Sequence, residues 1–115
     1  MVSVTTENTL LTAYNRMRGS DVSQLPVIND GRLVGILDEE DLLMNVYRNE
    51  GLFSETVSSV MVSKLETLDV QSDEAKLYET LSNGKVAIIF DKETFVGFIT
   101  KVDLINRYKS AFALS

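Results

Sequence analysis

The sequence predicts an α+β fold in which a β-α-β-β-α unit occurs twice, with pseudo-two-fold symmetry and the two sheets packed face to face. The first observation is an internal repeat, because residues 25–30 resemble 86–91 and residues 33–37 resemble 95–99. The second is that each copy has only about 55 residues, a size at which a separate core is marginal. The third is that the central strands are almost entirely apolar, which indicates burial on both faces.

The first copy is predicted to contain a short extended segment, a helix, a hairpin and a second helix. Thr6 is the expected N-cap of the first helix, because a Thr hydroxyl accepts hydrogen bonds from the first backbone N–H groups. The hairpin covers 25–37, and its Asp30-Gly31 turn supplies the positive φ angles that a tight turn requires. An apolar stripe beginning at Leu42 then predicts the second helix.

The second copy repeats this order after an extended segment over 65–70. Ser72 is the expected N-cap of its first helix, and a stripe of Ala75, Tyr78 and Leu81 is expected to face the core. The hairpin covers 86–99 and leads into the last helix. The repeat spacing is 66 positions before the first helix, 61 in the first hairpin strand and 62 in the second. These values predict that the second copy has five residues fewer than the first between its first strand and its hairpin. They also predict one residue more in the turn of the second hairpin.

Three regions follow from the repeat. The first copy is placed at residues 1–50, a polar linker at 51–56 and the second copy at 57–113. The first copy has little chain before its first helix, so it is expected to be truncated at its N-terminus.

Composition excludes several classes of function. There are 17 acidic and 11 basic side chains, for a net charge of −6, and no basic run, so nucleic acid and membrane surfaces are not expected partners. The absence of Cys and His excludes disulfides, thiolate zinc sites and a Ser-His-Asp triad, so an enzyme is not expected. No apolar run reaches the length of a membrane span, and no signal peptide is recognisable, which favours a cytoplasmic location.

The doubled motifs resemble a tandem pair of CBS domains over about residues 2–110. The resemblance rests on Gln24-Leu25-Pro26-Val27, the following Asp30-Gly31 and Val34-Gly35-Ile36, Val57 to Met61, and Gly97 to Asp103. It is strongest for the C-terminal regulatory region of cystathionine β-synthase, on the basis of residues 23–27, 35–39, 65–70 and 86–89.

This resemblance implies an allosteric module that binds an adenosyl ligand in clefts between the repeats and controls an attached enzyme. S-adenosylmethionine is the first expectation, followed by AMP and ATP, because few basic side chains lie near the expected site to hold a phosphate chain. No cofactor is expected in this chain, since pyridoxal phosphate would belong to a catalytic domain that the sequence does not contain. The alternative is a structural dimerisation module without a ligand.

The best candidate site is the Thr100-x-x-Asp103 motif at the start of the last helix. One interpretation is a capping pair, in which Thr and Asp satisfy backbone N–H groups. The resemblance implies a second interpretation, in which the Thr hydroxyl binds a phosphate or ribose oxygen and the Asp carboxylate accepts both ribose hydroxyls. By the same resemblance Val22, Ser23 and Gln24 form the facing wall, and an ordinary strand entry is the alternative for Ser23 and Gln24.

A second, weaker cleft is expected between Asp38 and Asp41 on one side and Gly84 and Lys85 on the other. Asp38 stands where the family has Thr or Ser, and residues 38–41 are all acidic, which would repel a phosphate. A metal site is not expected there, because consecutive helical residues point in different directions. A solvated, capped helix start is the alternative.

A homodimer is also expected, because the apolar helix faces exceed what a small core can cover. The side chains expected to include the subunit contacts are Leu43, Val46, Tyr47, Leu104, Ile105 and Tyr108.

Overall fold

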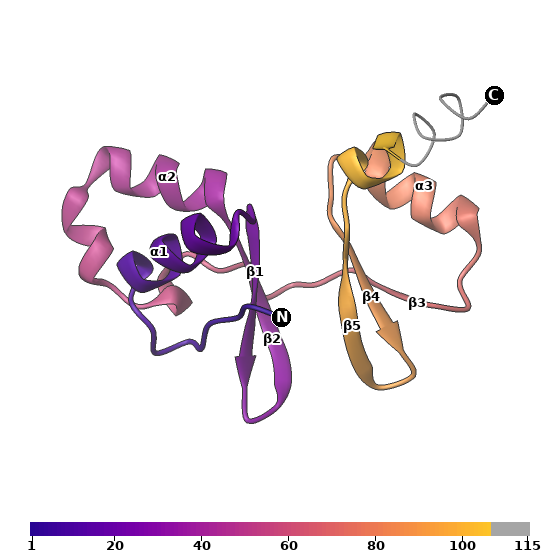
Figure 1. Cartoon of the computed structure of the whole chain (residues 1–115), viewed down its shortest axis with the longest axis horizontal. Helices are drawn as coiled ribbons and strands as arrows, with labels where there is room; N and C mark the ends of the chain where they lie inside the picture. The colour runs from indigo at the N-terminus through magenta and orange to yellow at the C-terminus, as the bar shows by residue number, and fades with distance from the viewer. Residues whose placement is uncertain (107–115) are drawn as a thin grey trace. The chain divides into compact units, whose positions relative to one another are not determined.

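The computed structural model describes residues 1–106 and divides the chain into two compact units, Met1–Leu65 and Glu66–Ser115. Each unit contains a hairpin preceded by one helix and followed by a second helical segment (Figure 1). The α+β class is therefore confirmed, as is the β-α-β-β-α order along the chain. Tyr108 and the other residues beyond 106 lie outside the described part.

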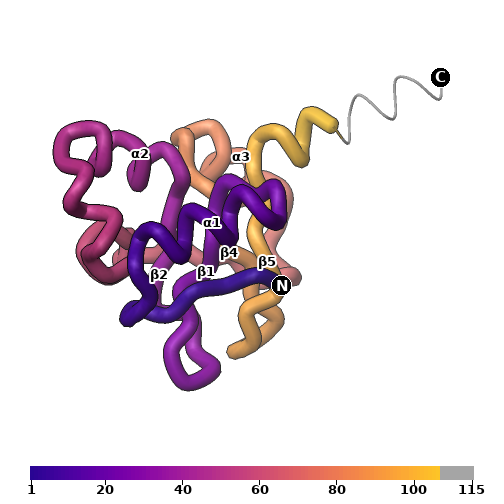
Figure 2. The backbone as a smooth tube through the Cα atoms, turned by 60° about the vertical axis from the view of Figure 1, so that its left-hand side comes forward, coloured from indigo at the N-terminus to yellow at the C-terminus, as the bar shows by residue number. Residues whose placement is uncertain are grey.

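The first unit packs two helices against one hairpin. Its elements are α1 (Leu10–Ser20), β1 (Gln24–Asn29), β2 (Arg32–Asp38), α2 (Glu39–Arg48) and two 3-10 turns, η1 (Glu50–Ser54) and η2 (Val57–Ser59). Before α1 the chain runs beside β1, where Val4 pairs in parallel with Val27 (Figure 2). All these parts except η1, whose Leu52 and Phe53 pack against it, contribute to one buried cluster: Val4, Leu10, Ala13, Met17, Leu25, Val27, Leu37, Leu42, Val46 and Val57.

The second unit has a three-stranded sheet in the order β3-β4-β5. Its elements are β3 (Thr67–Asp69), α3 (Glu74–Ser82), β4 (Ala87–Asp91), β5 (Thr94–Ile99) and the helical residues 101–106. β3 pairs with β4 in parallel, and β4 pairs with β5 antiparallel. Among the described residues of this unit, the buried apolar side chains are Leu81, Ala87 and Ile88.

Both predicted N-caps of the first helices are wrong, the first by three residues and the second by one. Thr9 caps α1, and its Oγ1 accepts a hydrogen bond from the N–H of Thr12 at 3.1 Å. Thr6 instead bonds Asn29, whose Nδ2 donates to the Thr6 Oγ1 at 2.8 Å. Asp73 caps α3 by accepting from Lys76 N–H at 3.0 Å. Short polar side chains next to one another compete for the cap position, and the turn geometry decides between them.

The second N-cap had been assigned to Ser72, which instead closes the turn after β3. Its Oγ accepts a hydrogen bond from Asp69 N–H at 3.1 Å. The residues of α3 that face inward also differ from the predicted stripe of Ala75, Tyr78 and Leu81. Leu77 is half-buried and Thr80 and Leu81 are buried, whereas Ala75 and Tyr78 are exposed. The expected stripe was thus correct only at Leu81.

The two hairpins have the same design, and the predicted extra turn residue is wrong. Asn29 pairs with Arg32 across a two-residue turn, and Asp91 pairs with Thr94 across another. Positive φ angles occur in both turns, at Asp30, Gly31 and Lys92. Both ladders also shift register at one place, between Val27 and Ile28 and between Ile89 and Phe90. The hairpins therefore correspond at a constant spacing of 62 positions.

The spacing before the hairpins also needs correction. The parallel pairs Val4–Val27 and Leu68–Ile89 occupy the same place in the two units, as do the N-caps Thr9 and Asp73. Leu68 follows Val4 by 64 positions and Asp73 follows Thr9 by 64, rather than the 66 predicted, whereas Ile89 follows Val27 by 62. The second copy is therefore two residues shorter between its first strand and its hairpin, and not five.

Candidate functional site

The candidate residues of the first unit gather where β2 leads into α2. Asp38 caps this helix, with its Oδ1 accepting a hydrogen bond from Glu40 N–H at 2.9 Å. Its Oδ2 accepts a second bond from the Gln24 side-chain amide at 3.2 Å. The Ser23 carbonyl accepts from the backbone N–H of Glu39 at 2.9 Å. The structure thus brings together Ser23, Gln24 and Asp38, which the sequence had assigned to different clefts.

Two further candidates of this unit have distinct environments. Asp41 is exposed on the first turn of α2, and its carbonyl accepts a hydrogen bond from the Asn45 side chain at 2.7 Å. Val22 is half-buried and packs against the core cluster of its unit, and its N–H donates to the Met17 carbonyl at 3.0 Å. Part of the Val22 side chain is therefore already engaged in the core.

The start of α2 is strongly acidic. Its N-cap and first turn carry the four carboxylates of Asp38, Glu39, Glu40 and Asp41. No basic partner forms an ion pair with them within residues 1–106. The described residues also contain no group of three or more acidic side chains placed to hold a metal ion. Negative charge at a helix N-terminus stabilises the helix, but it opposes an anionic ligand at the same place.

The candidates Thr100 and Asp103 form a reciprocal cap where β5 leads into the helical residues 101–106. The N–H and the hydroxyl of Thr100 donate to Asp103 Oδ2 at 2.9 and 3.1 Å. The Asp103 N–H approaches Thr100 Oγ1 at 3.3 Å in return. The capping interpretation is thus realised in this structure. Asp103 is exposed, and its Oδ1 accepts no hydrogen bond from any described residue.

Gly84 and Lys85 lie between α3 and β4 in the second unit. Gly84 has a φ of 77° and open space around it, so its conformation rather than crowding favours glycine. The Lys85 ammonium forms an ion pair with Glu66, and both side chains are more than half exposed. Lys85 precedes β4 as Glu66 precedes β3, and these strands pair in parallel. Sequence reasoning missed Glu66, although a parallel pairing of the two segments would have placed it beside Lys85.

Each predicted cleft combines residues of both units. Val22, Ser23, Gln24, Asp38 and Asp41 belong to the first unit, whereas Gly84, Lys85, Thr100 and Asp103 belong to the second. The structure describes the geometry of each group within its own unit. The pairing of the groups across the units stays a prediction.

The comparisons with known proteins agree with the repeat architecture. Residues 1–48 match the family model of the CBS domain. This part of the chain is therefore similar to a CBS domain. A CBS-domain-containing protein from Agrobacterium tumefaciens has a similar structure, with a TM-score of 0.85 at 20% identity, over 94% of this chain and 89% of that one.

Two further solved structures extend the likeness across both units. An uncharacterised conserved protein from Pyrococcus horikoshii has a TM-score of 0.83 at 26% identity, over 94% of this chain and 84% of that one. A CBS domain-containing protein of unknown function from Bacillus anthracis has a TM-score of 0.78 at 20% identity, over 95% and 84%. No curated protein matches the sequence significantly.

These likenesses show a fold shared with CBS-domain structures over nearly the whole chain. CBS-domain proteins are in general regulatory, ligand-binding modules, and nothing in the comparisons points specifically to cystathionine β-synthase. Among residues 1–106, no helix is both long enough and apolar enough to cross a membrane.

Proposed function

We propose that this chain is an allosteric regulatory module, without catalytic activity of its own, that binds an adenosyl ligand. The observation that carries the proposal is the Thr100–Asp103 pair. Asp103 Oδ2 is used by the cap, while the exposed Asp103 Oδ1 is left without a bond from the described residues. A carboxylate oxygen in this state can accept a ribose hydroxyl while the helix remains capped.

The charge around the candidate residues supports S-adenosylmethionine ahead of AMP and ATP. Lys85 is already paired with Glu66, and the start of α2 adds four carboxylates without a basic partner among the described residues. A triphosphate favours several Lys or Arg side chains, whereas a sulfonium cation is compatible with acidic surroundings. The ligand proposed first is therefore a nucleoside that carries positive charge.

The proposed target of regulation is an attached or associated catalytic domain, for which a cystathionine β-synthase-like enzyme is the first candidate. This assignment rests on the sequence resemblance of residues 23–27, 35–39, 65–70 and 86–89. Pyridoxal phosphate would be bound by that domain. The ligand can regulate it only if it binds one arrangement of the module more tightly than another.

Calorimetric titration of the full chain with S-adenosylmethionine, AMP and ATP tests the proposal. We expect S-adenosylmethionine to bind most tightly and Asp103→Asn to weaken it about tenfold or more, because a hydrogen bond to a charged group contributes about 1.5–3 kcal/mol. Asn retains an oxygen that can cap the helix, and Asp91→Asn is the matched control at an exposed acid, the last residue of β4. Failure of all three ligands to bind below about 1 mM would overturn the proposal.

A structural dimerisation module is the second candidate, because α2 exposes a cluster of large apolar side chains. Leu43 is 40%, Met44 55% and Tyr47 88% exposed. Val46 had been included among the candidate dimer contacts, but it is only 6% exposed and belongs to the core of its own unit. A homodimer in sedimentation analysis together with no ligand binding in the titration would favour this second function over the first.

A further inference from the structure

Asn83-Gly84 is the only place in the sequence where glycine follows asparagine. Every other asparagine precedes Thr, Arg, Asp, Val or Glu. The pair lies where α3 leads into β4, and both of its residues are exposed. The backbone nitrogen of a glycine easily approaches the side-chain carbonyl carbon of a preceding asparagine, because it carries no side chain that obstructs the approach and its backbone is permissive. This approach is the first step of deamidation.

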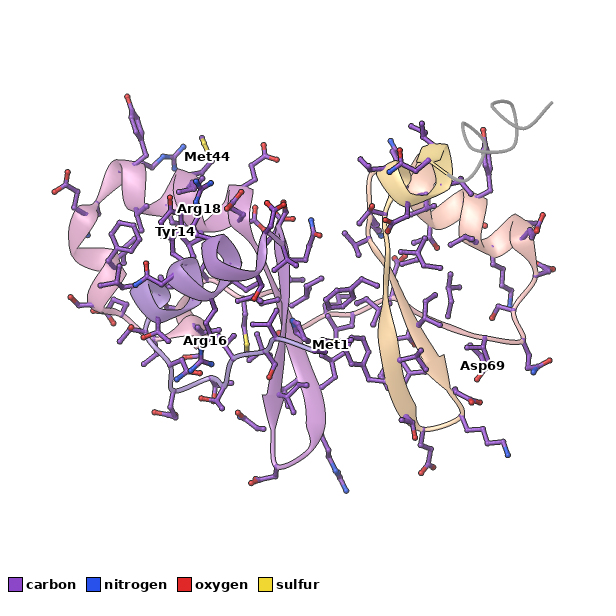
Figure 3. The ribbon with its side chains drawn as sticks, viewed as in Figure 1. Met1, Tyr14, Arg16, Arg18, Met44 and Asp69 are labelled. Atoms are coloured by element: carbon purple, nitrogen blue, oxygen red, sulfur yellow. The ribbon has the colours of Figure 1, made fainter. Side chains whose placement is uncertain are left out.

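The Asn83 side chain is not held in place, unlike those of several other asparagines. Asn8 Oδ1 accepts hydrogen bonds from Thr5 N–H at 2.8 Å and from the guanidinium of Arg16, labelled in Figure 3, at 3.4 Å. Three more asparagines use their side chains in hydrogen bonds: Asn29, Asn45 and Asn49. Within residues 1–106 the Asn83 side chain forms none, so it can rotate toward the backbone that follows it.

Asn15 is the closest comparison for Asn83 within the described chain. It is also exposed and also forms no side-chain hydrogen bond with any described residue. It lies in the middle of α1, however, and Arg16 follows it. The N–H of a residue in the middle of a helix is held by the carbonyl four residues earlier, and a side chain on that residue obstructs attack. Asn83 lies at the end of its helix, where both obstacles are weaker.

The folded turn slows the reaction but does not prevent it. Asn83 has a ψ of 10°, which directs the Gly84 nitrogen away from the Asn83 side-chain carbon. The Gly84 N–H donates to the Leu81 carbonyl at 3.1 Å, and the Lys85 N–H donates to the Thr80 carbonyl at 3.3 Å. The last turn of α3 must therefore open before Gly84 can attack. Helix ends open locally at a small cost in free energy, without unfolding of the whole protein.

We propose that Asn83 is a site of spontaneous deamidation whose rate is controlled by the opening of the last turn of α3. The Gly84 nitrogen forms a bond to Asn83 Cγ, and the Cγ–Nδ2 bond breaks. Nδ2 leaves as ammonia and takes the proton that the Gly84 N–H loses. Water then opens the five-membered imide at either of its two carbonyl carbons. One product is aspartate, and the other is isoaspartate, in which the main chain passes through the former side-chain carbon.

Both products change the connection between α3 and β4. Each places a new carboxylate two residues before Lys85, whose ammonium already pairs with Glu66. Isoaspartate also adds one carbon to the main chain, which displaces the Gly84 and Lys85 N–H groups from the end of α3. Gly84 and Lys85 belong to the weaker predicted cleft, so deamidation would add negative charge to that group of residues.

Peptide mapping of the full chain during storage at about pH 8 tests the site. After trypsin digestion, the peptide of residues 77–85 should gain the mass that accompanies replacement of NH2 by OH. The gain should appear about fivefold faster or more than at any other asparagine, Asn15 included. A synthetic peptide of residues 77–85 should react about fivefold faster or more than the folded chain, because it lacks the protecting turn. No gain at Asn83, or a faster gain elsewhere, would overturn the proposal, and equal rates in peptide and protein would overturn the control by the turn.

Two substitutions separate the site from the turn. Asn83→Gln keeps an amide but would require a six-membered ring, so its storage should not produce the additional acidic species that the unmodified chain gives in ion-exchange chromatography. Asn15→Gln is the matched control and should give this species at the original rate. Ser82→Gly removes the bond from Ser82 Oγ to the Glu79 carbonyl and weakens the last turn, so it should accelerate the reaction at Asn83 about twofold. The acidic species in Asn83→Gln, or an unchanged rate in Ser82→Gly, would contradict the proposal.

Discussion

The starts of the two helices that follow the hairpins occupy equivalent places but leave different groups free. Asp38 caps α2, and both of its carboxylate oxygens accept hydrogen bonds, one from Glu40 N–H and one from Gln24. At the equivalent position 62 residues later, Thr100 caps the helical residues 101–106, and Asp103 keeps one oxygen free among the described groups. The same backbone requirement is satisfied by Asp or by Thr. Whether the cap is Asp or Thr determines how much negative charge lies at the helix start.

The edges of the two cores differ in a similar way. In the first unit, Glu55–Ser58 bonds to the segment between Val4 and α1, and Val57 completes the core. In the second unit, the equivalent segment between β3 and α3 lines an open cavity. A repeated supersecondary unit can thus keep its ladder and helices while the edges of its two cores differ. We expect the first unit to depend for stability on Glu55–Ser58, which seals the edge of its core.

The largest expected effect is the loss of this seal in Val57→Asp. A carboxylate at a fully buried apolar position lacks a partner, so we expect the free energy of unfolding to fall by about 3 kcal/mol or more. Urea denaturation followed by circular dichroism measures the change. Val70→Asp, at a position that is 46% exposed at the cavity edge of the second unit, is the matched control and should cost less than about 1 kcal/mol. Equal losses in the two variants would contradict the difference between the two edges.

An exchange of the two caps tests the difference between the helix starts. Asp38→Thr removes one negative charge and the bond to Gln24 but leaves a good N-cap, so the stability should change by less than about 1 kcal/mol. We expect the affinity of the predicted cleft beside Asp38 for AMP to increase, because less charge repels the phosphate. Thr100→Asp should lower AMP affinity at the other helix start. Calorimetry measures both, and unchanged affinities would show that charge at the cap position does not select the ligand.

The sequence predicted the order of elements because the hairpins carry strong local signals. Asp30-Gly31 adopts the expected positive φ angles, and the apolar strands pair as expected. The repeat spacing was less accurate, because apolar strand residues resemble one another and a slip by one position costs little in a sequence match. Asp30 was matched to Asp91, whereas the ladder gives Asp91 the role of Asn29, the last paired residue before the turn.

The candidate site was predictable only at the level of single motifs. Thr100 and Asp103 form the expected cap because a capping box is encoded within four residues. The bond between Gln24 and Asp38 depends on the register of β1 against β2, and the ion pair of Lys85 with Glu66 depends on a parallel pairing of distant segments. Contacts of this kind are set by tertiary structure, so the residue pattern along the chain did not indicate them.

The smallest expected effects compare the ends of α1 and α3. Gly84 follows α3 with a φ of 77°, and a Cβ there meets no atom within 4 Å, so Gly84→Ala should cost about 1 kcal/mol through backbone strain alone. Gly19 lies within the last turn of α1, also in open space, and its φ is not positive. Gly19→Ala should therefore stabilise the protein by about 0.5–1 kcal/mol. Urea denaturation of both variants should give changes of opposite sign, and a stabilising Gly84→Ala would show that the left-handed conformation is not needed to lead α3 into β4.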